Sequence, residues 1–212
     1  MKVIKTPLGA LQENVYVAFC EDTKEGVLVD PGSNPEMILA ILKKNSVTLK
    51  YILLTHAHFD HIEAIPEIKK HLNVPVVVHE DEQEILGDAQ YNHSGKYAGE
   101  AVELTADIML KDGEELTVGN DSFRIIHTPG HTPGGACYYS EKSAIVFTGD
   151  TLFKDEVGRC DLYKGNLGQL VNGIKKNLFI LPDDVIVYAG HGENSSIGHE
   201  KIRNPYARLD RK

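Results

Sequence analysis

The segment THAHFDH at positions 55–61 constrains this chain more than any other part of the sequence. It carries four side chains that can bind metals, namely His56, His58, Asp60 and His61, and it overlaps the end of the apolar segment Tyr51–Thr55. That segment predicts a buried strand. Imidazole and carboxylate groups are the usual ligands of zinc and of similar divalent metals. A metal site explains four such groups at a strand end better than a run of polar loop residues does.

The spacing inside this segment indicates two sets of ligands. His56 and His58 point to the same side of an extended chain, whereas Asp60 and His61 fall where the chain turns into the next helix. This differs from the helical H-E-x-x-H zinc motif, in which both histidines lie on one helix face. The two pairs can therefore diverge toward different positions.

Three further ligand candidates each follow a predicted strand and lie beside glycine. They are His131 in TPGHTPG, Asp150 in TGDT and His191 in AGHG. Strand ends are where rigid scaffolds present functional side chains, and glycine lets the backbone approach a ligand closely. Each residue alone fits an ordinary turn, but their shared context predicts that all three belong to one site.

The hydrophobic patterns predict a mixed fold. Strands are expected at 15–19, 26–29, 51–55, 74–78, 116–118, 123–127, 136–139, 144–148 and 185–188, and helices at 35–45, 62–72, 81–86, 167–178 and 196–203. The polar stretch 21–25 predicts a hairpin between the first two strands, and the four strands between 116 and 148 predict an antiparallel meander. We expect one α+β domain over residues 1–212, with two packed sheets between outer helices, in four layers ordered α/β/β/α.

Composition narrows the possible partners and the compartment. The 212 residues are 42% hydrophobic and 25% charged, as in ordinary globular proteins. A net charge of −9 repels phosphate backbones, so we expect no nucleic-acid partner. The three cysteines form no C-x-x-C pair, which favours a reducing compartment. No apolar run has the length of a signal peptide or a membrane span, so we expect a cytoplasmic protein without a membrane partner.

The order of these motifs resembles the metallo-β-lactamase superfamily and, within it, the glyoxalase II-like hydroxyacylglutathione hydrolases in a single-domain form. The family pattern is an early Asp, then H-x-H-x-D-H, G-H-T-x-G, G-D and a late G-H, and it runs through nearly the whole chain. The resemblance implies two divalent metal ions, with zinc expected and iron or manganese as alternatives. It assigns the first metal to His56, His58 and His131, the second to Asp60, His61 and His191, and the bridging position to Asp150.

The resemblance also suggests roles for residues outside the ligand set. Asp30 resembles a family carboxylate that orients a ligand imidazole, although an aspartate before Pro-Gly is also a good turn former. Arg159 lies in a loop that resembles a family loop after the bridging aspartate, where it could hold a substrate carboxylate or form a surface ion pair. Cys160 is expected to be structural. We expect solvated or hydrogen-bonded histidines at 71, 79, 93, 127 and 199, and core or surface positions for the tyrosines at 91, 97, 163 and 188.

The implied reaction is hydrolysis of a small molecule. Two metals that share a water supply a hydroxide near neutral pH and polarise a carbonyl oxygen, and Asp60 would orient that hydroxide as the catalytic residue. A thiolate leaves without much protonation, and no general acid is evident in the sequence. The expected activity is therefore that of a thioesterase acting on S-acyl thiols such as hydroxyacylglutathione.

Several alternatives stay open. Glyoxalase II enzymes have a C-terminal helical region that binds glutathione, whereas this sequence ends soon after His191, so another thiol carrier or a lactone is compatible with the pattern. A mononuclear iron persulfide dioxygenase would use only His56, His131 and Asp150. The secreted β-lactamases are disfavoured because they carry cysteine at the position of Asp150 and need a signal peptide. A non-catalytic protein is disfavoured because all seven ligand positions are filled. The sequence does not indicate the oligomeric state.

Overall fold

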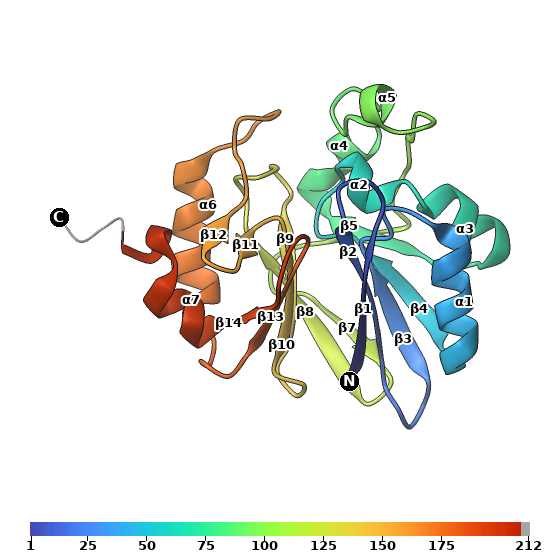
Figure 1. Ribbon diagram of the computed structural model, residues 1–212, viewed down its shortest axis with the longest axis horizontal. Coiled ribbons are helices and arrows are strands. Elements are labelled where there is room, and N and C mark those ends of the chain that lie inside the picture. The colour runs from blue at the N-terminus through green and yellow to red at the C-terminus, as the bar shows by residue number, and fades with distance from the viewer. Residues whose placement is uncertain (209–212) are drawn as a thin grey trace.

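A computed structural model describes residues 1–208 of the chain, and its core consists of two sheets that pack face to face (Figure 1). The first sheet has the strand order β1 (Lys2–Leu8), β2 (Glu13–Phe19), β3 (Glu25–Val29), β4 (Thr48–Leu53), β5 (Val76–His79) and β6 (Ile108–Leu110). The second has the order β14 (Ser195–Ser196), β13 (Ile186–Ala189), β10 (Ile145–Gly149), β9 (Ala136–Ser140), β8 (Asp121–His127) and β7 (Glu115–Val118). A small hairpin pairs β11 (Leu152–Phe153) with β12 (Glu156–Val157).

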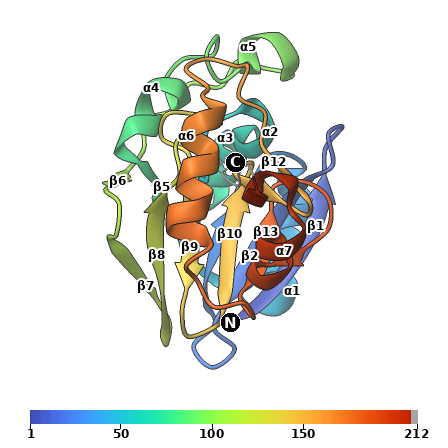
Figure 2. The same cartoon turned by 90° about the vertical axis from the view of Figure 1, so that its left-hand side faces the viewer.

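Helices cover the outer face of each sheet. The first sheet is covered by α1 (Pro35–Asn45) and α3 (Ile65–His71), and the second by α6 (Leu167–Gly173), its π-helical continuation η2 (Ile174–Leu178) and α7 (Ile197–Arg203) (Figures 1 and 2). The remaining helices are short: α2 (Phe59–Ile62), η1 (Glu80–Glu82), α4 (Gln83–Leu86), α5 (Ser94–Tyr97) and η3 (Pro205–Arg208). The expected four-layer order α/β/β/α is confirmed. None of the described helices is long and apolar enough to cross a membrane.

Three apolar clusters separate these layers. The cluster between the sheets contains Tyr16, Phe123, Tyr138 and Phe147, all fully buried. A second cluster lies beneath α1 and α3, and a third lies beneath α6 and α7. Strands β2, β9 and β10 are buried along their whole length because they have a layer on each side, which explains their nearly continuous apolar sequence.

The direction of the strands explains why the predicted ligands share one edge. In the first sheet β3, β4, β5 and β6 run parallel. In the second sheet β9 is antiparallel to both of its neighbours, β8 and β10, and β13 is parallel to β10. Strands β8, β10 and β13 therefore end on the same side of their sheet. The amide of Ala136 in β9 donates to the carbonyl of Thr55 (2.9 Å), which joins this side to the end of β4.

The helix expected at 62–72 is present, but it begins three residues later than predicted and follows a separate short helix. The chain forms α2 (Phe59–Ile62) inside the ligand segment and then a separate α3 (Ile65–His71). Pro66 stands in the first turn of α3, the place in a helix where proline is tolerated because its missing N–H would have no partner. The helix at 35–45, the hairpin of β2 with β3 and the meander of β7 to β10 agree with the prediction. Strands β1, β6, β11, β12 and β14 and the helical turn α5 were not foreseen.

Candidate metal centre

Three of the predicted ligands converge beyond the ends of β4 and β8. The Nδ1 atom of His58 lies 2.9 Å from Nε2 of His131, and the ring of His56 has its centroid 4.8 Å from that of His58 and 4.6 Å from that of His131. All three side chains are buried. One nitrogen from each lies within 4.8 Å of the others, so the three imidazoles can hold one metal ion.

Asp60, His61 and His191 form the second group. Oδ2 of Asp60 lies 3.2 Å from Nε2 of His191 and 3.7 Å from Nε2 of His61. Asp60 and His61 belong to α2, and His58 precedes that helix as its N-cap. The ring centroid of His61 lies 4.0 Å from that of His56, closer than the 4.8 Å between His56 and His58, so the two ligand groups adjoin each other and do not diverge.

Asp150 lies between the two groups. Its Oδ2 atom is 3.7 Å from Nε2 of His131, whereas its Oδ1 atom is 3.5 Å from Nε2 of His61 and 3.7 Å from Nε2 of His191. The two carboxylate oxygens therefore face different ligand groups. This is the position from which one carboxylate can bridge two metal ions.

Glycines next to the ligands allow this close packing. Gly149 turns the chain at the end of β10 with φ +48°, a conformation that favours glycine. A Cβ atom on Gly190 would lie 2.4 Å from Oδ1 of Asp150 and 2.9 Å from Cε1 of His61. Any side chain at position 190 would push these two ligands apart.

Asp30 joins the first turn to the ligand segment. Its Oδ1 atom accepts a hydrogen bond from the amide of Thr55 (2.8 Å), and its Oδ2 atom accepts one from the Thr55 hydroxyl (2.6 Å). The same Oδ2 atom lies 3.1 Å from Nδ1 of His61. Asp30 is therefore placed to fix the ring orientation of His61 with Nε2 directed toward Asp60 and Asp150.

Glu82 is a buried carboxylate that the sequence analysis missed. Its Oε1 atom accepts a hydrogen bond from the amide of Ala57 (2.8 Å), and its Oε2 atom accepts from the Thr132 hydroxyl (2.8 Å) and the Gly134 amide (3.0 Å). It thus ties the segment between His56 and His58 to the loop that carries His131. Burial raises the pKa of Glu82 to about 7.

Glu13 is a second buried carboxylate that was not foreseen. It is only 2% exposed, and neither of its carboxylate oxygens has a hydrogen-bond partner among the described residues. Its Oε1 atom lies 3.9 Å from Nδ1 of His61. Burial raises its pKa well above the ordinary value, and the nearby carboxylates of Asp30, Asp60 and Asp150 raise it further.

The charges of the site fit divalent cations. Burial and the neighbouring imidazoles lower the pKa of His56 and His58, which keeps both rings neutral and able to ligate. Burial opposes ionisation of Asp60, but His61 and a hydrogen bond from His191 hold its pKa well below the ordinary value.

Three ligand atoms are buried without a hydrogen-bond partner in the described part of the chain: Nε2 of His56, Nε2 of His61 and Oδ1 of Asp150. Buried polar atoms of this kind are costly unless something pairs with them, and metal ions held by the two ligand groups would pair with these atoms.

The ligands open into a pocket of about 600 Å³. Its walls away from the ligands include Leu11, His93, Lys96, Tyr97, Arg159 and Leu162. His93 differs from the expectation of an ordinary hydrogen-bonded histidine. Its ring stacks on that of His58 at a centroid distance of 5.5 Å, and its buried Nε2 atom has no partner among the described residues. Its φ of +65° is uncommon for a residue with a side chain.

Arg159 forms an ion pair at the mouth of this pocket. Its Nε and Nη2 atoms donate to the two carboxylate oxygens of Asp161 at 2.7 and 2.8 Å. Of the two roles considered for Arg159, the structure shows the surface ion pair. Cys160 is half-buried, with its Sγ atom 3.5 Å from the carbonyl oxygen of Gly158. The histidines at 71, 79, 127 and 199 have polar partners outside the pocket.

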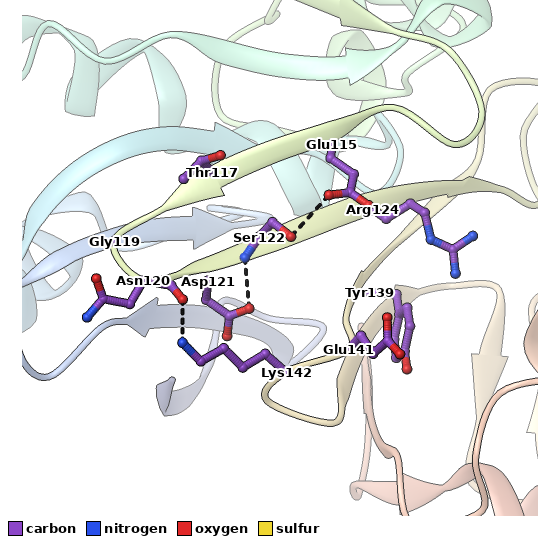
Figure 3. A pocket seen from close by; sticks show the side chains of 10 residues that line it. All are labelled: Glu115, Thr117, Gly119, Asn120, Asp121, Ser122, Arg124, Tyr139, Glu141 and Lys142. Carbon is purple, nitrogen blue, oxygen red and sulfur yellow. Dashed lines mark hydrogen bonds between the residues drawn. The ribbon is translucent and has the colours of Figure 1, made fainter.

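A second hollow lies on β7, β8 and the adjoining β9, and its lining contains none of the predicted ligands (Figure 3). Its polar groups pair with one another: the Ser122 hydroxyl donates to Glu115 (3.2 Å), and Lys142 donates to the carbonyl oxygen of Asn120 (2.6 Å). Polar groups satisfied in this way leave little for a ligand to bind. The hollow therefore supplies control positions for tests of the metal pocket.

Comparison with known proteins agrees with this geometry. The sequence profile of the Metallo-beta-lactamase superfamily matches residues 8–191. A Bacillus subtilis protein described as "Probable metallo-hydrolase YqgX" is 36% identical over 207 residues, which cover 97% of both chains. "Hydroxyacylglutathione hydrolase GloC" of Haemophilus influenzae is 31% identical over 208 residues, with 97% of this chain and 98% of the relative covered.

Two solved structures have the same fold at high similarity. The chain described as "BLEG-1 B3 metallo-beta-lactamase" is 39% identical with a TM-score of 0.90, and the match covers 97% of this chain and 99% of the other. TTHA1623, solved in a di-iron-bound form, is 35% identical with a TM-score of 0.84, and the match covers 96% and 99% of the two chains. The chain therefore belongs to the metallo-β-lactamase superfamily of metal-dependent hydrolases.

Proposed function

We propose that this protein is a binuclear thioesterase of the glyoxalase II type, which cleaves small S-acyl thiols such as hydroxyacylglutathione. The observation that carries the proposal is the position of Asp150, with one carboxylate oxygen toward His131 and the other toward His61 and His191. A site for a single metal would not need a carboxylate that faces two complete sets of ligands.

The donor set indicates where the metals would bind. His56, His58 and His131 would hold one ion, Asp60, His61 and His191 the other, and Asp150 both. Two divalent cations held there would supply a water molecule of lowered pKa and would polarise a carbonyl oxygen. Zinc suits these nitrogen and oxygen ligands, and iron or manganese would also be accepted.

The side chains of this protein would orient the reactants. Asp60 is held ionised by His61 and His191, so its carboxylate can accept a hydrogen bond from the attacking water. Asp30 keeps the His61 ring in position, and Glu82 holds together the two loops that bear His58 and His131. A thioester suits this site because its thiolate leaves with little need for a proton. The relative described as "Hydroxyacylglutathione hydrolase GloC" is named for a substrate of this class, which supports the proposal.

Hydrolysis of S-D-lactoylglutathione tests the proposal directly. We expect turnover that is lost on metal removal and recovered when zinc, iron or manganese is added. Acyl-homoserine lactones, run in parallel, should be cleaved more slowly. No hydrolysis by the metal-loaded protein of S-D-lactoylglutathione or of other S-acyl thiols would refute the thioesterase assignment, and faster cleavage of lactones would replace it with a lactonase.

β-Lactam hydrolysis is a second candidate because of the likeness to the chain described as a B3 metallo-β-lactamase. The secreted β-lactamases that carry cysteine at the position of Asp150 and need a signal peptide remain disfavoured by the sequence, whereas the chain described as a B3 enzyme is 39% identical to this one. A chromogenic cephalosporin in the same assay decides between the two substrates. We expect kcat/KM for the thioester to exceed that for the β-lactam, and the reverse order would make the lactamase the better assignment.

The persulfide dioxygenase alternative makes a different prediction. It requires about one iron per chain and oxygen consumption on glutathione persulfide, whereas a binuclear hydrolase requires two metals and consumes no oxygen. Elemental analysis and an oxygen electrode separate the two activities.

A further inference from the structure

Another cavity, of about 680 Å³ and distinct from the hollow of Figure 3, lies beside the metal pocket. It shares three lining residues with that pocket, namely His93, Lys96 and Leu162. It lies between the segment that leads into α5 and the loop after Arg159. The two cavities have similar volumes, so together they offer about twice the space of the metal pocket alone. A substrate that fills only the metal pocket would leave this space unused.

The wall of the cavity is largely apolar and preformed. The rings of Tyr91 and Tyr163 stack with centroids 3.9 Å apart and planes inclined by only 7°, and both pack against the apolar cluster beneath α1 and α3. The hydroxyl of Tyr163 donates to Glu84 (3.2 Å), which holds the ring in place. Ala89 and Gly95 contribute little side-chain volume to the lining. We call this cavity the tyrosine cleft.

An uncompensated positive charge stands where the two cavities meet. Lys96 forms no ion pair with any of residues 1–208, and its ammonium lies 4.7 Å from the centroid of the Tyr97 ring. The other cations nearby, Arg159 and Lys164, are paired with Asp161 and Glu84. In a chain of net charge −9, a lysine without a carboxylate partner at a pocket junction suits an anionic group of a ligand.

We propose that the tyrosine cleft binds the apolar acyl chain of the substrate, while Lys96 binds an anionic group of its thiol carrier. This rests on the proposed thioesterase function and narrows its substrate class to acyl thioesters with a chain longer than a hydroxyacyl group of a few carbons. The reacting carbonyl lies at the metal ligands, and the chain leaves the metal pocket past His93 and Leu162.

Binding of unreactive thioethers tests the cleft without any need for turnover. The probes are S-methyl-, S-butyl- and S-octylglutathione, measured by calorimetry on the metal-loaded protein. Burial of each methylene contributes up to about fourfold in affinity, so S-octylglutathione should bind more than about tenfold more tightly than the S-methyl probe. Tyr163→Ala should abolish most of this difference, whereas Tyr163→Phe, which keeps the ring, should retain it.

Lys96→Met tests the charge. It should weaken all three probes by a similar factor of about three to ten and should remove the dependence of Kd on salt concentration, since the three probes carry the same carboxylates. Arg124→Ala in the hollow of Figure 3 is the control for loss of a cation outside the metal pocket and the tyrosine cleft, and it should change no Kd. Metal content and melting temperature verify that each variant is folded.

Equal affinity for the three probes would overturn the proposal, and so would a chain-length preference that survives Tyr163→Ala. Hydrolysis of the matching S-acyl series separates this failure from that of the proposed function. Thioester hydrolysis without a chain-length preference would refute the tyrosine cleft alone. Cleft-dependent binding of S-octylglutathione without hydrolysis of any thioester would refute the thioesterase alone.

Discussion

The floor and the rim of the metal pocket are built in different ways. The floor consists of seven side chains that follow strands of both sheets and are fixed by buried partners such as Asp30 and Glu82. The rim includes the single helical turn α5 and the loop that carries Arg159 and Asp161. The side chains of Lys96 and Arg159 on this rim are exposed, and the backbone of His93 has a positive φ.

This difference separates the reaction from the choice of substrate. The ligands follow strands of the two sheets and are held by buried hydrogen bonds. Such a rigid setting fixes their positions accurately, which the binding of two metal ions requires. A short surface turn can change its side chains with little effect on the core, so it suits recognition of the parts of a substrate that do not react. Changes in the floor should therefore alter metal binding, whereas changes in the rim should alter affinity for substrate with metal retained.

The largest effect is expected from His58→Ala in the floor. Loss of one imidazole from the first ligand group should lower the metal content and reduce kcat/KM by more than about a hundredfold, because the nucleophile depends on the metals. Elemental analysis and thioester kinetics measure the two quantities. His71→Ala, at an exposed histidine of α3, is the control and should change neither. Full activity in the His58 variant would show that His58 is not a required metal ligand.

Glu82→Gln should have the next largest effect, although Glu82 touches no metal ligand side chain. Removing a carboxylate that accepts three hydrogen bonds should weaken metal affinity by about tenfold to a hundredfold. It should also lower the free energy of unfolding by about 1–3 kcal/mol. Metal titration and urea denaturation measure these effects. Glu80→Gln, at an exposed position of the same segment, is the matched control, and equal behaviour of the two variants would show that Glu82 does not position the loops.

His93→Asn separates the rim from the floor. Asparagine tolerates the positive φ of this position but cannot reach as far into the pocket as an imidazole. We expect kcat/KM to fall by about tenfold with two metals still bound. A loss of metal together with activity would instead place His93 among the residues that support His58.

The smallest effect is expected from Arg159→Ala. The pair with Asp161 is exposed, so its loss should leave the melting temperature unchanged. If Arg159 also contacts the substrate, KM should rise by a few-fold while kcat is retained, which is the signature of lost ground-state binding. Unchanged KM and kcat would limit Arg159 to the ion pair.

The floor could be predicted from the sequence because its signals are local. The ligand segment at 55–61 is contiguous, and His131, Asp150 and His191 each follow a strand and adjoin glycine. Their convergence required only that the strands share an edge. The break between α2 and α3 was missed because the apolar spacing continues across it, although Pro66 marks the start of the second helix.

The supporting residues and the rim could not be predicted, because their roles depend on contacts between distant segments. Glu82 lies in the acidic stretch EDEQE at 80–84, whose composition indicates a solvated surface, yet it is fully buried. Glu13 is followed by an apolar strand and precedes any motif, and its position beside His61 comes from the packing of β2 against α2. His93 and Tyr163 face the pockets only because α5 and the loop after Arg159 lie side by side.

The stoichiometry of metal activation tests the central claim most directly. Protein stripped with a chelator should be titrated with zinc, iron and manganese while thioester hydrolysis and bound metal are followed together. Two ligand groups joined by Asp150 predict that activity reaches its maximum at two metal ions per chain and that Asp150→Asn lowers this number. Full activity at one ion per chain would contradict the binuclear site.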